Sequence, residues 1–144
     1  MTSNASNLNA EQLLKLTKRH AIVEYKRQLD DLMDTMVEEP LYEFLVQGLM
    51  LRGGERVRRY YQQFFEGYMS RATHGRVLGL WGDEVSVARE DSIDYDGVDG
   101  PEVHRVMSVF FADGDLLGGE RIYASDHVVR MMAGEMYDEL EPIA

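Results

Sequence analysis

Residues 104–132 read HRVMSVFFADGDLLGGERIYASDHVVRMM, and this stretch decides the fold. An apolar run ends at Asp113-Gly114, a pair typical of tight turns, and a second short run follows it. The segment then changes to helical spacing. We expect a β-hairpin that leads into a C-terminal helix at about 126–139. Its inward side chains would be Val128, Val129, Met132 and Met136.

The first half of the chain predicts helices. Asn9 and Gln12 have the spacing of a capping box, so we expect a helix from there to about Val37, after a frayed tail at 1–8. Its apolar stripe would comprise Ile22, Tyr25, Leu29, Leu32 and Met36. Pro40 should end this helix, and residues 41–47 (LYEFLVQ) suit a short strand.

A second helix is predicted at 55–71, directly after Gly53-Gly54. Its sequence, ERVRRYYQQFFEGYMSR, repeats large apolar side chains at helical intervals. Such a wide face needs a broad surface to pack on, most simply a sheet. The residues of that face are Val57, Tyr60, Tyr61, Phe64, Phe65 and Tyr68.

Residues 76–125 read mainly as strands. Gly82-Asp83 marks a hairpin between RVLGLW and EVSVAREDSIDY, and residues 95–101 are rich in turn formers. The order of helices, then strands, then a helix predicts an α+β fold. We expect four or five mostly antiparallel strands, curved so that a cone-shaped hollow remains against the helices.

Composition limits the classes of function. The chain has 144 residues, which suits a single domain over 9–144, and its formal net charge is −11. Such an acidic surface disfavours nucleic acid and anionic membranes. The sequence contains no cysteine, no apolar run near the roughly 20 residues of a membrane span, and no signal-peptide pattern at its start. We therefore expect a cytoplasmic protein.

Three segments in this order resemble the nuclear transport factor 2-like superfamily, in particular its SnoaL-like branch: GGERVRRYYQQFF, VMSVFFADGDLLGGERIYAS and HVVRMMAG. The resemblance covers roughly residues 20–135. It implies a cone-shaped α+β barrel and a homodimer. Members of that superfamily include polyketide cyclases, ketosteroid isomerases, epoxide hydrolases and proteins without enzymatic activity, so the fold leaves the function open.

One position departs from the pattern of the cyclases. The cyclases carry an acid/base aspartate two residues after a tyrosine that corresponds to Tyr123 here. This chain has Ser125 at that position. The nearest aspartate, Asp126, is one step later and on a strand would point to the other face. Asp126 is better suited to capping the last helix.

The predicted catalytic residues are His104, Tyr123 and Glu90. Tyr123 could donate a hydrogen bond to a carbonyl or enolate oxygen if it faces the hollow. His104 could transfer protons near neutral pH, and Glu90 could orient it across a hairpin. The alternatives are a half-buried tyrosine, a structural histidine and an exposed carboxylate.

Further residues are predicted to contact a ligand, although core packing, a dimer interface or the surface are open alternatives for them. Two of them follow Pro40 at the expected mouth of the cone, two lie on the aromatic helix, and the last two lie on or after strands. They are Tyr42, Glu43, Tyr61, Phe64, Trp81 and Ser125.

The sequence predicts no metal and no cofactor. The histidines at 20, 74, 104 and 127 lack the paired spacing of zinc ligands, and no phosphate-binding or dinucleotide motif occurs. Epoxide hydrolysis would need an aspartate–arginine–aspartate arrangement, and none is evident in the sequence.

Two functions remain open. The first is a cofactor-free cyclase or isomerase that moves a proton beside the carbonyl group of a small, apolar ligand. The second is a non-catalytic dimeric module that binds a ligand or a protein, which the serine at position 125 favours. A buried carboxylate or histidine with a displaced pKa in the cavity would favour the enzyme.

Overall fold

The computed structural model describes residues 5–144. Of the tail predicted at 1–8, residues 1–4 lie outside the described part. Residues 5–8 lie against the turn at Gly114. The Asn7 amide donates a hydrogen bond to the Gly114 carbonyl oxygen at 2.9 Å, and the Gly114 amide donates one to the Ala5 carbonyl oxygen at 3.1 Å. Ala5 and Asn7 are therefore held by backbone hydrogen bonds to Gly114.

The first helix is shorter than predicted. α1 (Ala10–Tyr25) begins with the expected capping box between Asn9 and Gln12. It ends where Arg27 adopts a left-handed conformation with φ 58°, and a separate short helix, α2 (Leu29–Met33), follows. The prediction of one helix to Val37 is therefore wrong.

The predicted apolar stripe is wrong at its first two positions, whereas Leu32 and Met36 are buried and Leu29 is partly buried against the core. Ile22 and Tyr25 are 53% and 81% exposed. The buried face of α1 instead carries two polar side chains, Thr17 and His20, between apolar neighbours. Periodicity of apolar residues alone could not reveal a helix face that is buried through hydrogen bonds.

The strand after these helices begins earlier than expected. β1 (Met36–Phe44) contains Pro40 instead of following it. Pairing of β1 with β6 shifts register between Met36 and Leu41, so the proline, which has no N–H, lies at an irregularity in the ladder. β2 (Leu49–Arg52) then returns antiparallel to β1.

The aromatic helix is confirmed. α3 (Gly54–Gln63) continues through a π-helical segment, Phe64–Tyr68, into α4 (Met69–Arg71). The side chains of its predicted apolar face are buried, with Phe64 partly so. The π-segment widens the helix where Phe64, Phe65 and Tyr68 turn toward the sheet.

The strand-rich half forms one curved sheet. Its long strands are β3 (Ala72–Gly82), β4 (Ser86–Gly97), β5 (Gly100–Asp113) and β6 (Leu116–Tyr123), and the full order is β3-β4-β5-β6-β1-β2-β7, where β7 is Glu141–Pro142. Within residues 5–144, β1 and β6 pair in parallel, and the other neighbouring strands of the sheet pair antiparallel. The predicted loop at 95–101 is mostly strand, because β4 and β5 pair as far as Gly97 and Gly100. The α+β class is confirmed, with seven strands instead of four or five.

The last helix closes one end of the sheet. α5 (Asp126–Ala133) continues as a 3-10 helix, Gly134–Glu139. Its cap is Ser125, whose hydroxyl accepts from the Val128 amide at 3.3 Å. The predicted cap, Asp126, is wrong; its carboxylate instead contacts Arg130 and Tyr137.

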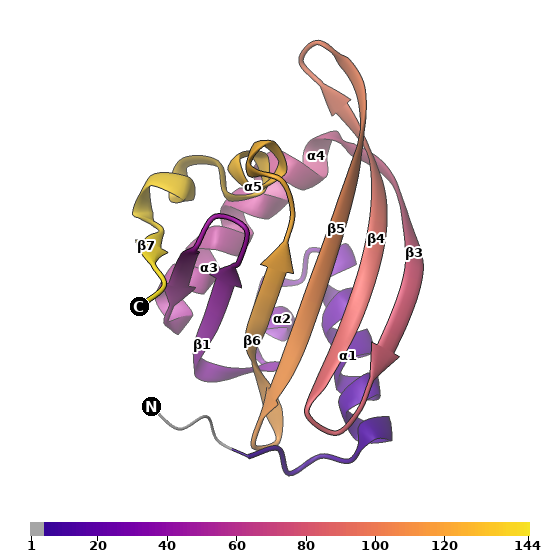
Figure 1. Cartoon of the computed structure of the whole chain (residues 1–144), viewed down its shortest axis with the longest axis vertical. Helices are drawn as coiled ribbons and strands as arrows, with labels where there is room; N and C mark the ends of the chain where they lie inside the picture. The colour runs from indigo at the N-terminus through magenta and orange to yellow at the C-terminus, as the bar shows by residue number, and fades with distance from the viewer. Residues whose placement is uncertain (1–4) are drawn as a thin grey trace.

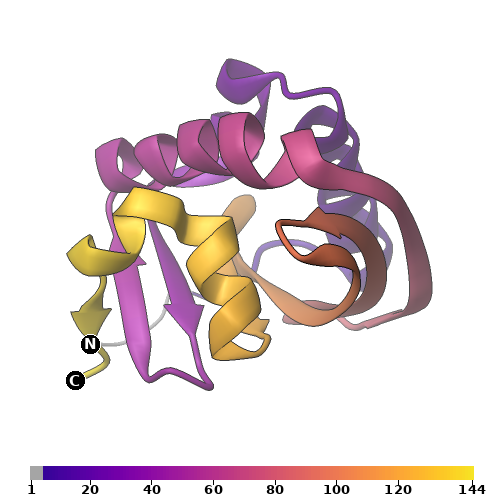
Figure 2. The same cartoon turned by 90° about the horizontal axis from the view of Figure 1, so that it is seen from above.

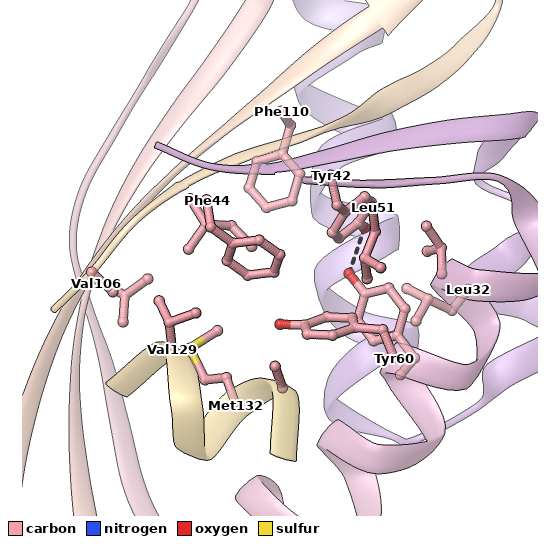
Figure 3. Close-up of a cluster of buried hydrophobic side chains, with 14 of the residues drawn as sticks. Leu32, Tyr42, Phe44, Leu51, Tyr60, Val106, Phe110, Val129 and Met132 are labelled. Carbon is pink, nitrogen blue, oxygen red and sulfur yellow. Dashed lines mark hydrogen bonds between the residues drawn. The ribbon is translucent and has the colours of Figure 1, made fainter. Parts of the chain in front are cut away.

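The curved sheet and the helices form two layers that face each other. Figure 1 shows the sheet curving in front of α1, α2 and α3, and Figure 2 shows it curling toward α3 with α5 across the end. In Figure 3, Phe44, Val106 and Phe110 of the sheet face Val129 and Met132 of α5.

In residues 5–144, no helix has the length and apolar character needed to cross a bilayer.

Candidate functional site

A cavity of about 60 Å³ lies between the concave face of the sheet and the helices. Apolar lining side chains come from the π-segment, the sheet and α5, and polar ones come from α1, α3, the π-segment and the sheet. The polar lining residues are Glu24, Tyr60, Tyr61, Tyr68, Arg89, Asp91, Ser108 and Glu120, and the apolar ones are Phe64, Ile93, Val106, Phe110, Ile122 and Met132. The site therefore combines an apolar wall with a concentrated set of ionisable groups.

Glu120 points into the cavity because side chains along β6 alternate between the two faces of the sheet. Its neighbours in the inward row are Tyr42 of β1 and Phe110 of β5, which pair with it directly. Gly119 allows β6 to lie close to β1. It adopts φ 146°, and any Cβ there would overlap the Leu41 carbonyl oxygen of β1. Glu120 is 6% exposed, so its carboxyl group is removed from bulk water.

Burial raises the pKa of Glu120 to about 7, although hydrogen bonding from Ser108 and the charge of Arg89 oppose that rise. Glu24, from α1, lines the same cavity. Burial, and next the charge of Glu120, raise the pKa of Glu24 above its usual range. Two carboxyl groups in one cavity thus both favour the protonated form more than a free glutamate does.

Arg89 supplies the compensating charge. Its Nε lies 2.9 Å from Oδ2 and 3.0 Å from Oδ1 of Asp91, two residues along on the same face of β4. The guanidinium also lowers the pKa of Glu24 and of Glu120 through its charge. The cavity therefore has an arginine among three carboxyl groups, one on its own strand and two on other elements.

Two tyrosines extend the polar wall. The hydroxyl groups of Tyr42 and Tyr61 lie 2.5 Å apart, and the Tyr61 hydroxyl is 3.4 Å from Oε2 of Glu120. Burial raises the pKa of both phenols well above the usual value, so they stay protonated and can donate hydrogen bonds.

His20 is a neutral neighbour of this wall. Thr35 donates its hydroxyl proton to the Leu32 carbonyl at 2.6 Å, so it accepts from His20 Nδ1–H at 2.7 Å. His20 Nε2 then has a free lone pair, 3.4 Å from the Tyr61 hydroxyl. Burial, and next the charge of Arg89, lower the pKa of His20 to about 3, so this histidine does not carry charge near neutrality.

Comparison with known proteins places this architecture. No protein-family model and no curated protein sequence matches the chain. Solved structures do match it. An LEH-like epoxide hydrolase from M. tuberculosis superposes with TM-score 0.64 at 14% identity, over 90% of this chain and 98% of that one. A protein from Catenulispora acidiphila with a ketosteroid isomerase-like fold, solved with trimethylamine, gives 0.63 at 13%, over 83% and 92%.

The chain has the nuclear transport factor 2-like fold. An NTF2-like protein from Anabaena variabilis superposes with TM-score 0.61 at 18% identity, over 80% of this chain and 90% of that one. A shared fold at such low identity does not by itself assign any particular chemistry to the chain. The SnoaL-like branch stays a prediction.

Three of the predicted residues belong to the cavity or its wall. Tyr61 and Phe64 line the cavity. Tyr42 does not line it, but its hydroxyl group is hydrogen-bonded to that of Tyr61. The expectation that Tyr123 points into the hollow is wrong: it is 41% exposed, and the inward residues of β6 are Glu120 and Ile122. The strand lies where the sequence predicted it, but its inward-facing residues are the alternate ones.

The other predicted residues lie outside the cavity. Glu90 bonds to Arg105 at 2.9 Å on the convex face of the sheet, and Glu43 approaches Arg121 at 3.6 Å on the same face. Trp81 is 54% exposed, and Ser125 caps α5. The prediction that Glu90 lies beside His104 is wrong, because Glu90 pairs with Met107 across the ladder and His104 pairs with Ile93.

His104 is buried in a different cluster. Its Nε2 lies 2.8 Å from Oε1 of Glu102, which also lies 2.8 Å from Nε2 of His127 in α5. Hydrogen bonds from the two imidazoles hold the pKa of Glu102 below its usual range. Together the three side chains form a group with the composition of a metal site within the described part of the chain.

The main ionisable groups of the cavity could not be identified from the sequence, because their position depends on which face of each strand points inward. On β4 the sequence favoured Glu90, which lies in the outward row. The inward row instead carries Arg89 and Asp91 between Val87 and Ile93. An arginine and an aspartate two residues apart, flanked by apolar residues in the same row, would have been the usable signal.

Proposed function

We propose that the protein is a cofactor-free enzyme that transfers protons to and from a small, mostly apolar substrate with one reacting oxygen. The observation that carries this proposal is the pair of cavity carboxyl groups with raised pKa, Glu24 and Glu120. A general acid and a general base work best when their pKa values lie near the operating pH. An ordinary core gains nothing from two such groups, since each costs free energy when it ionises.

The roles follow from the charges around each group. Glu120 receives hydrogen bonds from Ser108 and Tyr61, which favour its ionised form, so it is the base. Glu24 has its pKa raised by burial and by the charge of Glu120, so it keeps the proton and is the acid. Arg89 has no removable proton near neutrality and therefore orients and balances the carboxylates.

The reaction class that this arrangement favours is addition of water to an epoxide. Glu120 takes a proton from water, the water oxygen forms a bond to one epoxide carbon, and the carbon–oxygen bond breaks. Glu24 gives its proton to the departing oxygen, so the product is a diol. Afterwards Glu120 holds the proton and Glu24 is ionised, and exchange with solvent restores the starting state. Arg89 supports this proposal, because it pairs with Asp91 and its charge also acts on Glu120, although the second carboxyl group is a glutamate and not the aspartate that the sequence analysis looked for.

A second candidate is isomerisation beside a carbonyl group, and the hydrogen-bonded pair of Tyr42 and Tyr61 favours it. Protonated phenols can stabilise an enolate oxygen while a carboxylate moves the proton between carbons. Both candidates use Glu120 as the base, so they differ in whether a water oxygen enters the product.

The size of the cavity limits the substrate. About 60 Å³ holds a few non-hydrogen atoms, well below the roughly 300 Å³ at which pockets for drug-sized ligands begin. The substrate is therefore small, or Phe64 and Met132 move aside to admit more of it. Both side chains belong to the helical wall, where a rotamer change leaves the sheet intact.

The test uses the full chain with small cyclic epoxides and β,γ-unsaturated ketones in ¹⁸O-labelled water. We expect a diol containing one ¹⁸O atom from the epoxides. Glu120→Gln should lower kcat at least about 100-fold, in the range typical of lost acid–base catalysis. Glu90→Gln is the matched control, since Glu90 lies one residue from Arg89 on the opposite face, and it should keep full activity.

Conversion of ketones without label would support the isomerase candidate. No turnover of either class, together with tight binding of the same compounds, would support the non-catalytic module. Equal activity in Glu120→Gln and in the unchanged chain would contradict the proposed site. The homodimer and a cytoplasmic location remain predictions from the resemblance and the composition, and light scattering in solution tests the first.

A further inference from the structure

Glu102, His104 and His127 meet near the end of the sheet where α5 crosses it. Glu102 and His104 are two residues apart on β5, and His127 comes from the first turn of α5. The donor atoms of all three lie within 4.8 Å of one another. Figure 1 shows α5 at the same end of the sheet as the β4–β5 hairpin, so the cluster joins two parts of the chain at that end.

We propose that these three side chains bind one divalent cation of the zinc class. Two imidazoles and one carboxylate are ligands that zinc accepts, and three protein ligands leave a fourth position for water or substrate. This proposal does not depend on the proposed enzymatic function, since none of the three residues lines the acid–base cavity.

The hydrogen-bond pattern already aims both imidazoles at one point. Nε2 of His104 and Nε2 of His127 each lie 2.8 Å from the same oxygen, Oε1 of Glu102. Tetrahedral zinc with bonds of about 2.0–2.1 Å separates its ligand atoms by about 3.3 Å. Opening the cluster by roughly half an ångström would therefore admit the ion. His127 is 63% exposed and Glu102 is 28% exposed, so both can move that far.

His104 has the support that a metal-binding histidine needs. Its other ring nitrogen, Nδ1, lies 2.7 Å from the hydroxyl of Tyr68. When Nε2 binds a cation, the ring proton must be on Nδ1, and the Tyr68 oxygen is in place to accept it. The Tyr95 ring stacks on the imidazole with centroids 4.7 Å apart, which fixes the plane of the ring.

Tyr68 also connects this site to the cavity, because it lines the cavity while bonding to His104. Its role would be that of a positioning residue for His104. Loss of its hydroxyl should weaken cation binding about 10-fold, the lower end of the range for such outer partners. A purely structural role would instead leave the affinity for the cation unchanged.

The experiment is titration of the full, metal-depleted chain with zinc chloride, followed by calorimetry, and with cobalt chloride, followed by visible absorption. We expect one saturable site per chain and, with cobalt, intense bands of a four-coordinate ion. His127→Ala and Glu102→Gln should each weaken zinc binding at least 10-fold. His127 is exposed, so its removal should leave the fold intact, which circular dichroism checks.

The matched control is His74→Ala, which removes an exposed histidine on β3 outside the cluster and should leave the affinity unchanged. Tyr68→Phe should weaken zinc binding about 10-fold with the same stoichiometry, which is less than the loss in His127→Ala. The proposal is overturned if no saturable site exists. It is also overturned if His127→Ala binds zinc as tightly as the unchanged chain, which would mean that the three residues form only a hydrogen-bonded cluster.

Discussion

Arg89 Nε contacts both carboxylate oxygens of Asp91, at 2.9 and 3.0 Å, although only one residue separates them on β4. The strand alternation places both side chains on the concave face, where they share a cavity with Glu24 and Glu120. The contact with Asp91 holds the Arg89 guanidinium, and therefore its positive charge, inside the cavity. The behaviour of the two glutamates depends on that charge.

Replacing Arg89 by methionine should raise the pKa of both Glu24 and Glu120 further, since the guanidinium lowers both. The ionised form of the base would then be reached only at higher pH, and the acidic limb of the pH–rate profile should move to alkaline pH. Arg89→Lys keeps a charge and should shift the profile less. An unchanged profile in Arg89→Met would show that the guanidinium does not act on the base.

Replacing Glu120 by glutamine should stabilise the protein at alkaline pH. A carboxyl group whose pKa is higher in the folded state gives stability that is fully present below its unfolded pKa. That stability is lost as the pH rises through the folded pKa of about 7. Each pKa unit corresponds to about 1.36 kcal/mol, so relative to pH 5 the variant should gain roughly 3 kcal/mol over the unchanged chain at pH 9. Urea unfolding at the two pH values measures this difference.

Glu90→Gln again serves as the control for stability, since Glu90 is on the convex face and pairs with Arg105. Its effect should be small and nearly the same at pH 5 and pH 9. If both glutamine variants gave the same pH dependence, burial of Glu120 could not be its cause.

His20 should remain neutral from pH 8 down to at least pH 5. Burial, and next the charge of Arg89, lower its pKa to about 3, and Thr35 fixes its proton on Nδ1. In a proton–nitrogen correlation spectrum, we expect the Nδ1–H tautomer with ring shifts that do not change in this range. A titration near pH 6.5, the value of a free imidazole, would contradict the hydrogen-bond network described here.

Replacing Gly119 by alanine should destabilise the protein severely. Gly119 has φ 146°, and a Cβ there would overlap backbone atoms of Leu41 on the neighbouring β1. We expect a loss of about 3 kcal/mol or more, because both backbone strain and steric overlap oppose the change. Gly75→Ala on β3 is the matched control, since a Cβ there meets nothing within 4 Å. Thermal unfolding of the two variants compares them.

Much of the fold could be predicted because its signals are local. The aromatic spacing from Val57 to Tyr68, the Asp113-Gly114 turn and the apolar residues of α5 each determine an element without knowledge of the rest. The long first helix was predicted wrongly because the break at Arg27 is a single left-handed residue with no glycine or proline to mark it.

The candidate site could be predicted only in part, since it depends on which face of each strand is buried. A shift of one residue exchanges Glu120 for Arg121 and Arg89 for Glu90, and the sequence contains charged residues in both rows. The choice between the rows is made by packing against α1 and the π-segment, which local patterns do not encode. The cluster of Glu102, His104 and His127 likewise requires knowing that α5 returns to β5.

The most direct test of the acid–base cavity is a pH titration of the glutamate side-chain carboxyl carbons by ¹³C nuclear magnetic resonance. Glu24→Gln and Glu120→Gln would assign the two signals. We predict that the Glu120 carbon titrates near pH 7 in the unchanged chain and that the Glu24 carbon also titrates above the usual range for glutamate. Titration of both carbons between pH 4 and 5, as in an exposed glutamate, would contradict the account.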